Sequence, residues 1–142
     1  MNNFIESVKA QMPAGAELGS GRFVVMGTPS GEVSFVVPEN DPETVVARAE
    51  VGSLEGVADP DAFLRDMMAA NRFWTGTNGA VLSLGDGDKV YLTARYEDDL
   101  FVDEEALGNV IGALAGTLKE WREHLAFIGG RLPESESGKE VL

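Results

Sequence analysis

The longest amphipathic pattern in the chain covers residues 103–130, DEEALGNVIGALAGTLKEWREHLAFIGG. Its large apolar side chains recur at steps of three and four, which is the spacing of one face of an α-helix. They are Leu107, Val110, Ile111, Leu114, Leu118, Trp121, Leu125 and Ile128. Asp103 can cap the helix at its start, and Gly129-Gly130 can end it. The pattern therefore predicts a long helix with one face against a core.

Shorter patterns upstream predict two more helices and five strands. The expected helices cover residues 3–12 and 60–72, and the expected strands cover 22–27, 32–37, 44–51, 80–84 and 89–96. Pro29-Ser30-Gly31 and Gly85-Asp86-Gly87-Asp88 are typical turn sequences, and each predicts an antiparallel hairpin. The expected order is α-β-β-β-α-β-β-α, so the fold class is α+β, an antiparallel sheet with helices. We expect one domain over residues 1–130 and a polar, flexible tail over 131–142.

Composition excludes several classes of protein. The chain has 142 residues, no cysteine and a net charge of -13. Nucleic acids and anionic membranes attract clustered Lys and Arg, so neither is an expected partner. No apolar run has the length needed to cross a bilayer, and the start lacks a signal peptide, so we expect a cytoplasmic protein. The acidity fits a carrier of apolar surface, or it serves solubility alone.

No catalytic or metal-binding motif stands out. His124 is the only histidine, and its position near a helix C-terminus favours a solvated side chain. Several His or Cys ligands would be needed for a zinc site, and no phosphate-binding or dinucleotide-binding loop is present. We therefore expect no catalytic residue, no metal and no cofactor. An enzyme that uses carboxylates from distant segments remains the alternative.

Apolar residues are more abundant in three places than a small monomer needs. The middle helix and its exit carry the first set, which we interpret as a dimer interface or, alternatively, as an ordinary core helix. These residues are Phe63, Leu64, Met67, Met68, Phe73 and Trp74. The first helix carries the second set, which packing on the sheet would also explain without a partner. The strands carry the third set, and a strand edge there can accept an extended peptide. Gly108, Gly112 and Gly116 predict close packing on another element, or a groove.

The stretch 47–127 resembles the class I type III secretion chaperones, the Tir-chaperone family. The resemblance is carried by AEVGSL at 49–54, FLRDMMAAN at 63–71, GAVLSL at 79–84, VYLTARY at 90–96 and the Trp-bearing last helix. It implies a homodimer formed through the middle helix and the strand after it. It also implies binding of the unfolded N-terminal segment of a secreted effector, without nucleotide. The effector-binding residues implied are Phe4, Ile5, Val8, Phe23, Val25, Val33 and Phe35. A regulatory or adaptor domain of the same fold is the alternative.

Overall fold

The computed structural model describes residues 3–11, 23–72 and 76–133 of the chain. The elements are α1 (Asn3–Gln11), β1 (Phe23–Thr28), β2 (Gly31–Val36), β3 (Thr44–Ser53), α2 (Pro60–Asn71), β4 (Val81–Leu84), β5 (Lys89–Glu97) and α3 (Glu104–Phe127), with short 3-10 helices η2 (Asp86–Asp88) and η3 (Asp98–Leu100). The expected order and the α+β class are confirmed. Most bounds differ from the expected ones by one residue, and β3 is longer by two residues because it continues through a β-bulge near Gly52.

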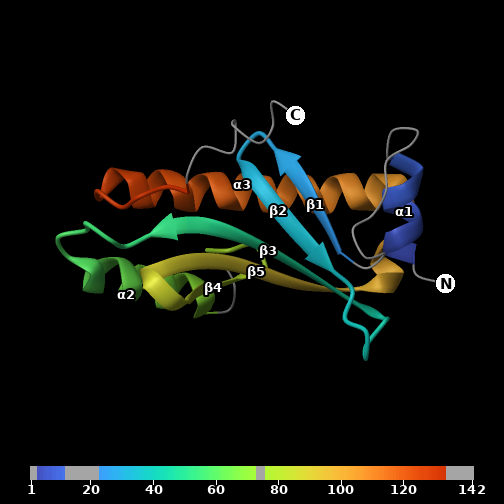
Figure 1. Cartoon of the computed structure of the whole chain (residues 1–142), viewed down its shortest axis with the longest axis horizontal. Coiled ribbons are helices and arrows are strands. Elements are labelled where there is room, and N and C mark those ends of the chain that lie inside the picture. The colour runs from blue at the N-terminus through green and yellow to red at the C-terminus, as the bar shows by residue number, and fades with distance from the viewer. Residues whose placement is uncertain (1–2, 12–22, 73–75, 134–142) are drawn as a thin grey trace.

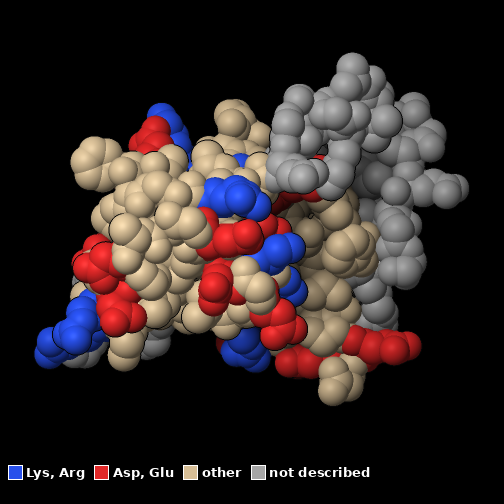
Figure 2. Space-filling view, turned by 60° about the vertical axis from the view of Figure 1, so that its left-hand side comes forward, with Lys and Arg blue, Asp and Glu red and all other residues tan. Residues whose placement is uncertain are grey.

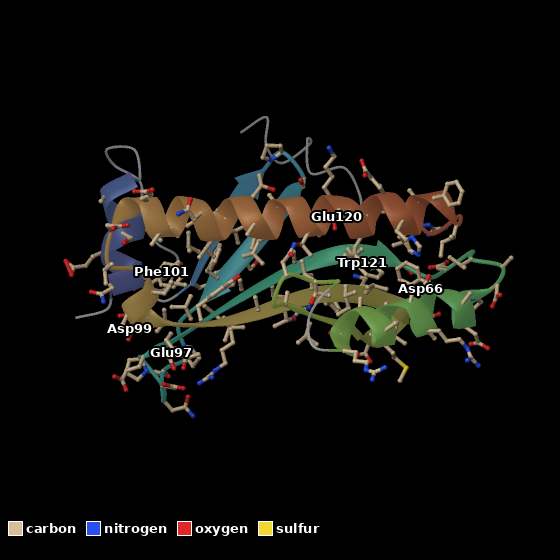
Figure 3. All side chains as sticks on the ribbon, turned by 180° about the vertical axis from the view of Figure 1, so that it is seen from behind. Asp66, Glu97, Asp99, Phe101, Glu120 and Trp121 are labelled. Atoms are coloured by element: carbon tan, nitrogen blue, oxygen red, sulfur yellow. The ribbon has the colours of Figure 1, made fainter. Side chains whose placement is uncertain are left out.

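The five strands form one antiparallel sheet in the order β1-β2-β3-β5-β4. The long strands β3 and β5 are paired at its centre, and the β1–β2 hairpin extends away from them (Figure 1). The β1–β2 hairpin passes in front of α3 in Figure 1, and the view from behind shows α3 and α2 in front of the strands (Figure 3). The helices therefore cover one face of the sheet, which we call the inner face. The opposite face is called the outer face.

The core lies between the inner face and α3. Alternate residues of β2 and β3 are buried, as expected when only one face of a sheet meets other elements. Val33, Phe35 and Val45 come from the strands, and Leu118 and Leu125 come from α3. Fully burying a side chain of this size stabilises the fold by about 1.5–3 kcal/mol. The apolar residues whose spacing predicted the long helix are therefore the residues that pack against the inner face.

A distant carboxylate holds α1 in place. The backbone N–H groups of Asn3 and Phe4 donate to the two carboxylate oxygens of Asp98, at 2.7 and 2.9 Å. These donors have no partner inside the helix, because the first turn of any helix leaves its N–H groups unpaired. The Phe4 ring packs beside Phe35 and Phe101, with centroids 5.2 and 5.1 Å away. Asp98 thus caps the N-terminus of α1, although it lies far from this helix in the sequence.

The chain turns back onto the sheet after α3. Gly129 has φ of +90°, a left-handed conformation that glycine adopts without strain at a helix end. Arg131 then pairs with Ser53: Ser53 N–H donates to the Arg131 carbonyl at 2.7 Å, and Arg131 N–H donates to the Ser53 carbonyl at 3.0 Å. The expected tail starts at 131, so its first residue is held by the end of β3. Residues 134–142 lie outside the described part of the chain.

We predict that Asp98→Ala lowers the free energy of unfolding by about 1–2 kcal/mol, the usual cost of removing a side-chain cap. Urea unfolding followed by circular dichroism measures this change. The exposed neighbour Asp99 provides the control, and Asp99→Ala is expected to stay within about 0.5 kcal/mol of the parent chain. Equal effects from the two substitutions would contradict the proposed anchoring of α1.

Candidate protein-binding surfaces

Apolar side chains form a row across the outer face. Phe23 of β1 lies directly opposite Val36 of β2, and Val36 lies opposite Val46 of β3. Val25 follows in the next row, two residues along β1. The exposed fractions are 41% for Phe23, 45% for Val25 and 37% for Val36. Because side chains alternate between the faces of a strand, these residues are exposed by the same register that buries Val33 and Phe35.

A groove crosses the outer face next to this row. Its volume is about 930 Å³, at the upper end of the range for small-molecule pockets, and it is open to solvent. At one end it is lined by Phe23, Val36 and Val46, and at the other by Lys89, Arg131 and Leu132. The lining combines these apolar side chains with polar and charged ones such as Ser34, Arg48 and Glu50, and an open groove of mixed lining suits a segment of polypeptide better than a compact metabolite.

Charged side chains around the groove are mostly paired. Lys89 Nζ lies 3.9 Å from a Glu50 carboxylate oxygen, and Arg131 lies 3.7 Å from a carboxylate oxygen of Glu55. The Arg48 guanidinium instead lies over the ring of Tyr91, with its central carbon 4.0 Å from the ring centroid. Figure 2 shows basic and acidic side chains intermingled on the side of the molecule that it presents. The groove is thus locally balanced, although the whole chain is strongly acidic.

The implied effector-binding residues divide into two groups. Phe4, Val8, Val33 and Phe35 are buried in the core and Ile5 is half-buried, whereas Phe23 and Val25 are exposed on the outer face. A buried side chain that already packs on its own protomer has no surface to offer a partner. The set was implied by the family resemblance and combines residues of both faces, because no local pattern tells which face the helices cover. The proposal below therefore uses only the exposed members.

The residues expected at a dimer interface also differ in their exposure to solvent. Phe63 and Met67 are buried beneath α2, and Leu64 is half-buried. Met68 is 74% exposed. Phe73 and Trp74 lie outside the described residues. Phe63 and Met67 therefore fix α2 to its own protomer, which was the alternative interpretation of this helix, while Met68 remains available on the surface.

Aromatic and charged side chains join α2 to α3. The Phe63 ring stacks on His124, with centroids 5.1 Å apart, and meets the Trp121 ring edge-on at 5.7 Å. His124 Nε2 lies 3.1 Å from a carboxylate oxygen of Asp66 (Figure 3 labels Asp66 and Trp121). His124 was expected to be a solvated side chain, and it is 40% exposed, but it also has a partner that its sequence neighbours did not indicate. No local signal links positions 66 and 124, because only the packing of the two helices brings them together.

The end of α2 also protects one edge of the sheet. The Asn71 side chain donates to the Leu82 carbonyl and accepts from the Leu82 N–H, both at 2.8 Å. Leu82 is in β4, which is an edge strand, so the amide of Asn71 occupies backbone groups that a further strand would need. β1 is the other edge strand. Among the described residues, no comparable side-chain clamp is seen on the backbone of β1.

The glycines of α3 face open space. A Cβ atom added at Gly108, Gly112 or Gly116 would meet nothing within 4 Å. The expected close packing of this stripe on α1 or on the sheet is therefore wrong, because these positions lie on the side of α3 that faces away from the core.

An acidic depression lies at the opposite end of the sheet from α2. It has a volume of about 410 Å³, and its acids already act within the fold: Asp98 caps α1, and Asp41 accepts from Thr44 at 2.7 Å. Burial raises the pKa of the nearby Tyr96 to about 12, so this phenol stays neutral at physiological pH.

Within the described ranges no group of three or more His, Cys, Asp or Glu is placed to hold a metal ion. Across the same residues, none of the helices is long and apolar enough to cross a membrane.

Comparison with known proteins identifies a family and a fold. The model of the Tir chaperone protein (CesT) family matches residues 15–122. A chain in the crystal structure of the ExsC–ExsE complex is similar at 14% identity and a TM-score of 0.64, covering 85% of this chain and 90% of that one. The HopA1–SchA chaperone–effector complex contains a chain similar at 12% identity and a TM-score of 0.60, covering 85% and 89%.

A third similar structure is the heterodimeric ExoU–SpcU complex from the type III secretion system of Pseudomonas aeruginosa. Its matching chain is 17% identical with a TM-score of 0.58, and the match covers 95% of this chain and 100% of that one. At these identities the structures establish the fold and nothing further. No curated protein matches the sequence significantly.

We predict that Phe63→Ala lowers the free energy of unfolding by about 3–5 kcal/mol, because it leaves a cavity between α2 and α3. Met68→Ala, five positions further along the same helix, is expected to change it by no more than about 0.5 kcal/mol. Chemical denaturation of the two variants, at a protein concentration low enough to keep the chain monomeric, gives both values without a contribution from contacts between copies. A large loss from Met68→Ala alone would contradict this assignment of the two faces of α2.

Proposed function

The chain belongs to the Tir chaperone protein (CesT) family, and we propose that it is a type III secretion chaperone. In this role it binds the non-globular N-terminal segment of a secreted effector in the cytoplasm and keeps that segment soluble until export. The observation that carries the proposal is the outer face, which none of the described helices covers and where an exposed apolar row lines part of the groove. The family is a chaperone family and not an enzyme family.

The effector segment binds at β1 and across the outer face. β1 is the edge strand whose backbone lacks a clamp like that of Asn71 within the described residues, so an extended segment can add there as a further strand. Hydrogen bonds between backbones form with almost any client sequence. Phe23 and Val25 add apolar contacts, which favour client segments with apolar side chains. Burying such side chains stabilises the complex by about 25 cal/mol per Å² of apolar surface, which offsets the entropy lost when a flexible client becomes ordered.

A second copy of the chain binds along the exposed face of α2. Met68 is the large apolar residue at the centre of this face, and Arg65, Ala69 and Arg72 lie beside it at helical spacing. Met and Arg are both enriched at protein interfaces. Such a homodimer buries Met68 and leaves the outer face of each protomer open, so that one client can cross two equivalent grooves.

We predict that the double substitution Phe23→Glu and Val25→Glu abolishes co-purification of the client from a native lysate of the source organism. Two carboxylates at this edge repel an apolar segment without disturbing the core. Val102→Glu is the matched control, because Val102 is 72% exposed at the start of α3, away from the groove. The captured proteins are identified by mass spectrometry, and one of them is then truncated at its N-terminus.

The proposal requires that this truncation removes binding. A client that still binds through its folded domain would contradict the chaperone assignment and favour an adaptor. Retention of the client by the double variant would contradict the assignment of the surface.

We predict that Met68→Glu converts the homodimer to a folded monomer, because a charge in the centre of the interface cannot be buried there without a partner. Sedimentation equilibrium measures the mass, and circular dichroism confirms that the helices persist. Val102→Glu again serves as the control and is expected to keep the dimer mass. A dimer of unchanged affinity in the Met68→Glu variant would contradict the proposed interface.

A further inference from the structure

Arg48 occupies the middle of the outer face. It lies on β3, directly opposite Ser34 of β2 and Thr93 of β5, so its neighbours across the strands carry no charge. Along β3, Val46 of the apolar row precedes it by two residues, a distance of about 7 Å on the same face. Both side chains line the groove. A cation is thus placed in the lining of the groove between apolar Val46 and acidic Glu50, the residues two positions before and after it on the same face of β3.

The neighbours of Arg48 hold its guanidinium in a fixed position. Its central carbon lies 4.0 Å from the centroid of the Tyr91 ring, so the cation rests on the negatively polarised face of the aromatic ring. The ring itself is confined by Gly85, because a Cβ at that position would lie 2.7 Å from Tyr91 Cε2. A side chain held in this way loses less conformational freedom when it binds a ligand.

The other cations of the groove differ from Arg48. Lys89 and Arg131 lie within ion-pair distance of Glu50 and Glu55, whereas Arg48 is stacked on a ring, and within the described ranges no carboxylate is seen at ion-pair distance from its guanidinium. A guanidinium presents paired N–H donors that match the two oxygens of a carboxylate. On a chain of net charge -13, an acidic segment is repelled everywhere unless a local cation receives it.

We propose that the groove selects client segments that carry an Asp or Glu side chain next to apolar residues, with the carboxylate bound by Arg48. This inference rests on the proposed function, since it defines which sequences the outer face accepts. The apolar residues contact Phe23, Val36 and Val46, and the carboxylate pairs with the guanidinium two residues along β3. Arg48 is then a residue that determines specificity, while the apolar row provides most of the buried area.

The test uses the full chain and a random peptide library displayed on phage, so that no client has to be known. Peptides that bind the parent chain and lose binding to the Phe23→Glu and Val25→Glu variant are sequenced. We expect these outer-face peptides to be enriched in Asp or Glu flanked by apolar residues. Replacing that acid by its amide in a synthetic peptide is expected to weaken binding about fivefold, the upper range for an exposed ion pair.

The selection is repeated on variants of Arg48. Arg48→Glu is expected to change the enriched charge from acidic to basic, Arg48→Gln to remove the charge preference, and Arg48→Lys to retain it. Lys119→Glu makes the same charge change on the exposed side of α3, and the enriched sequences should stay acidic. Because Arg48 is exposed, urea unfolding is expected to show that each variant remains folded and loses at most the small contribution of an exposed contact with the Tyr91 ring.

Two results would overturn the inference, and they differ in what else they affect. Outer-face peptides without enriched acids, or with a preference that ignores the charge at position 48, would reject the role of Arg48 and leave the proposed function standing. A library that yields no peptide dependent on Phe23 and Val25 would reject both the role of Arg48 and the binding surface.

Discussion

The packing of α3 against one face of the sheet determines which side chains this protein shows to solvent. Strand register places Val33, Phe35 and Val45 on the inner face, where the leucines of α3 bury them. The same register leaves the alternate residues on the outer face. Asp98 adds to this division by holding the start of α1, whose Phe4 is buried beside Phe35. The core and the proposed binding surface therefore both result from the alternation of side chains along the strands.

An open apolar face is a risk for a soluble protein, because strand edges and exposed apolar rows promote aggregation. The net charge of -13 opposes self-association at long range. Asn71 occupies the backbone of Leu82 on the β4 edge, and β1 is the other edge of the sheet, where we propose that a client binds. The fold thus limits where an extended chain can bind, and it does so with contacts between residues that are close in space but separated in sequence.

The periodicity of apolar residues was sufficient to predict the helices and strands, but not which face of the sheet the helices cover. The long helix and both hairpins follow from spacing and turn residues, so they were predicted to within a few residues. Phe4 and Phe35 were expected at a binding surface because the family resemblance implied it, and periodicity could not correct this, since it groups residues on one side of an element without saying which side is covered. The pairing of His124 with Asp66 and the open space at Gly112 depend on how α2 and α3 are placed, which no local pattern encodes.

The central claim is that the outer face of the sheet receives the client while the inner face stays closed. Amide chemical-shift mapping by NMR, with the N-terminal segment of the client added to the labelled chaperone, tests it most directly. The account predicts shifts concentrated at β1, at Val36 and Val46, and around Arg48 and Tyr91. Shifts confined to the exposed side of α3, at Gly108, Gly112 and Gly116, with the sheet unaffected, would contradict it.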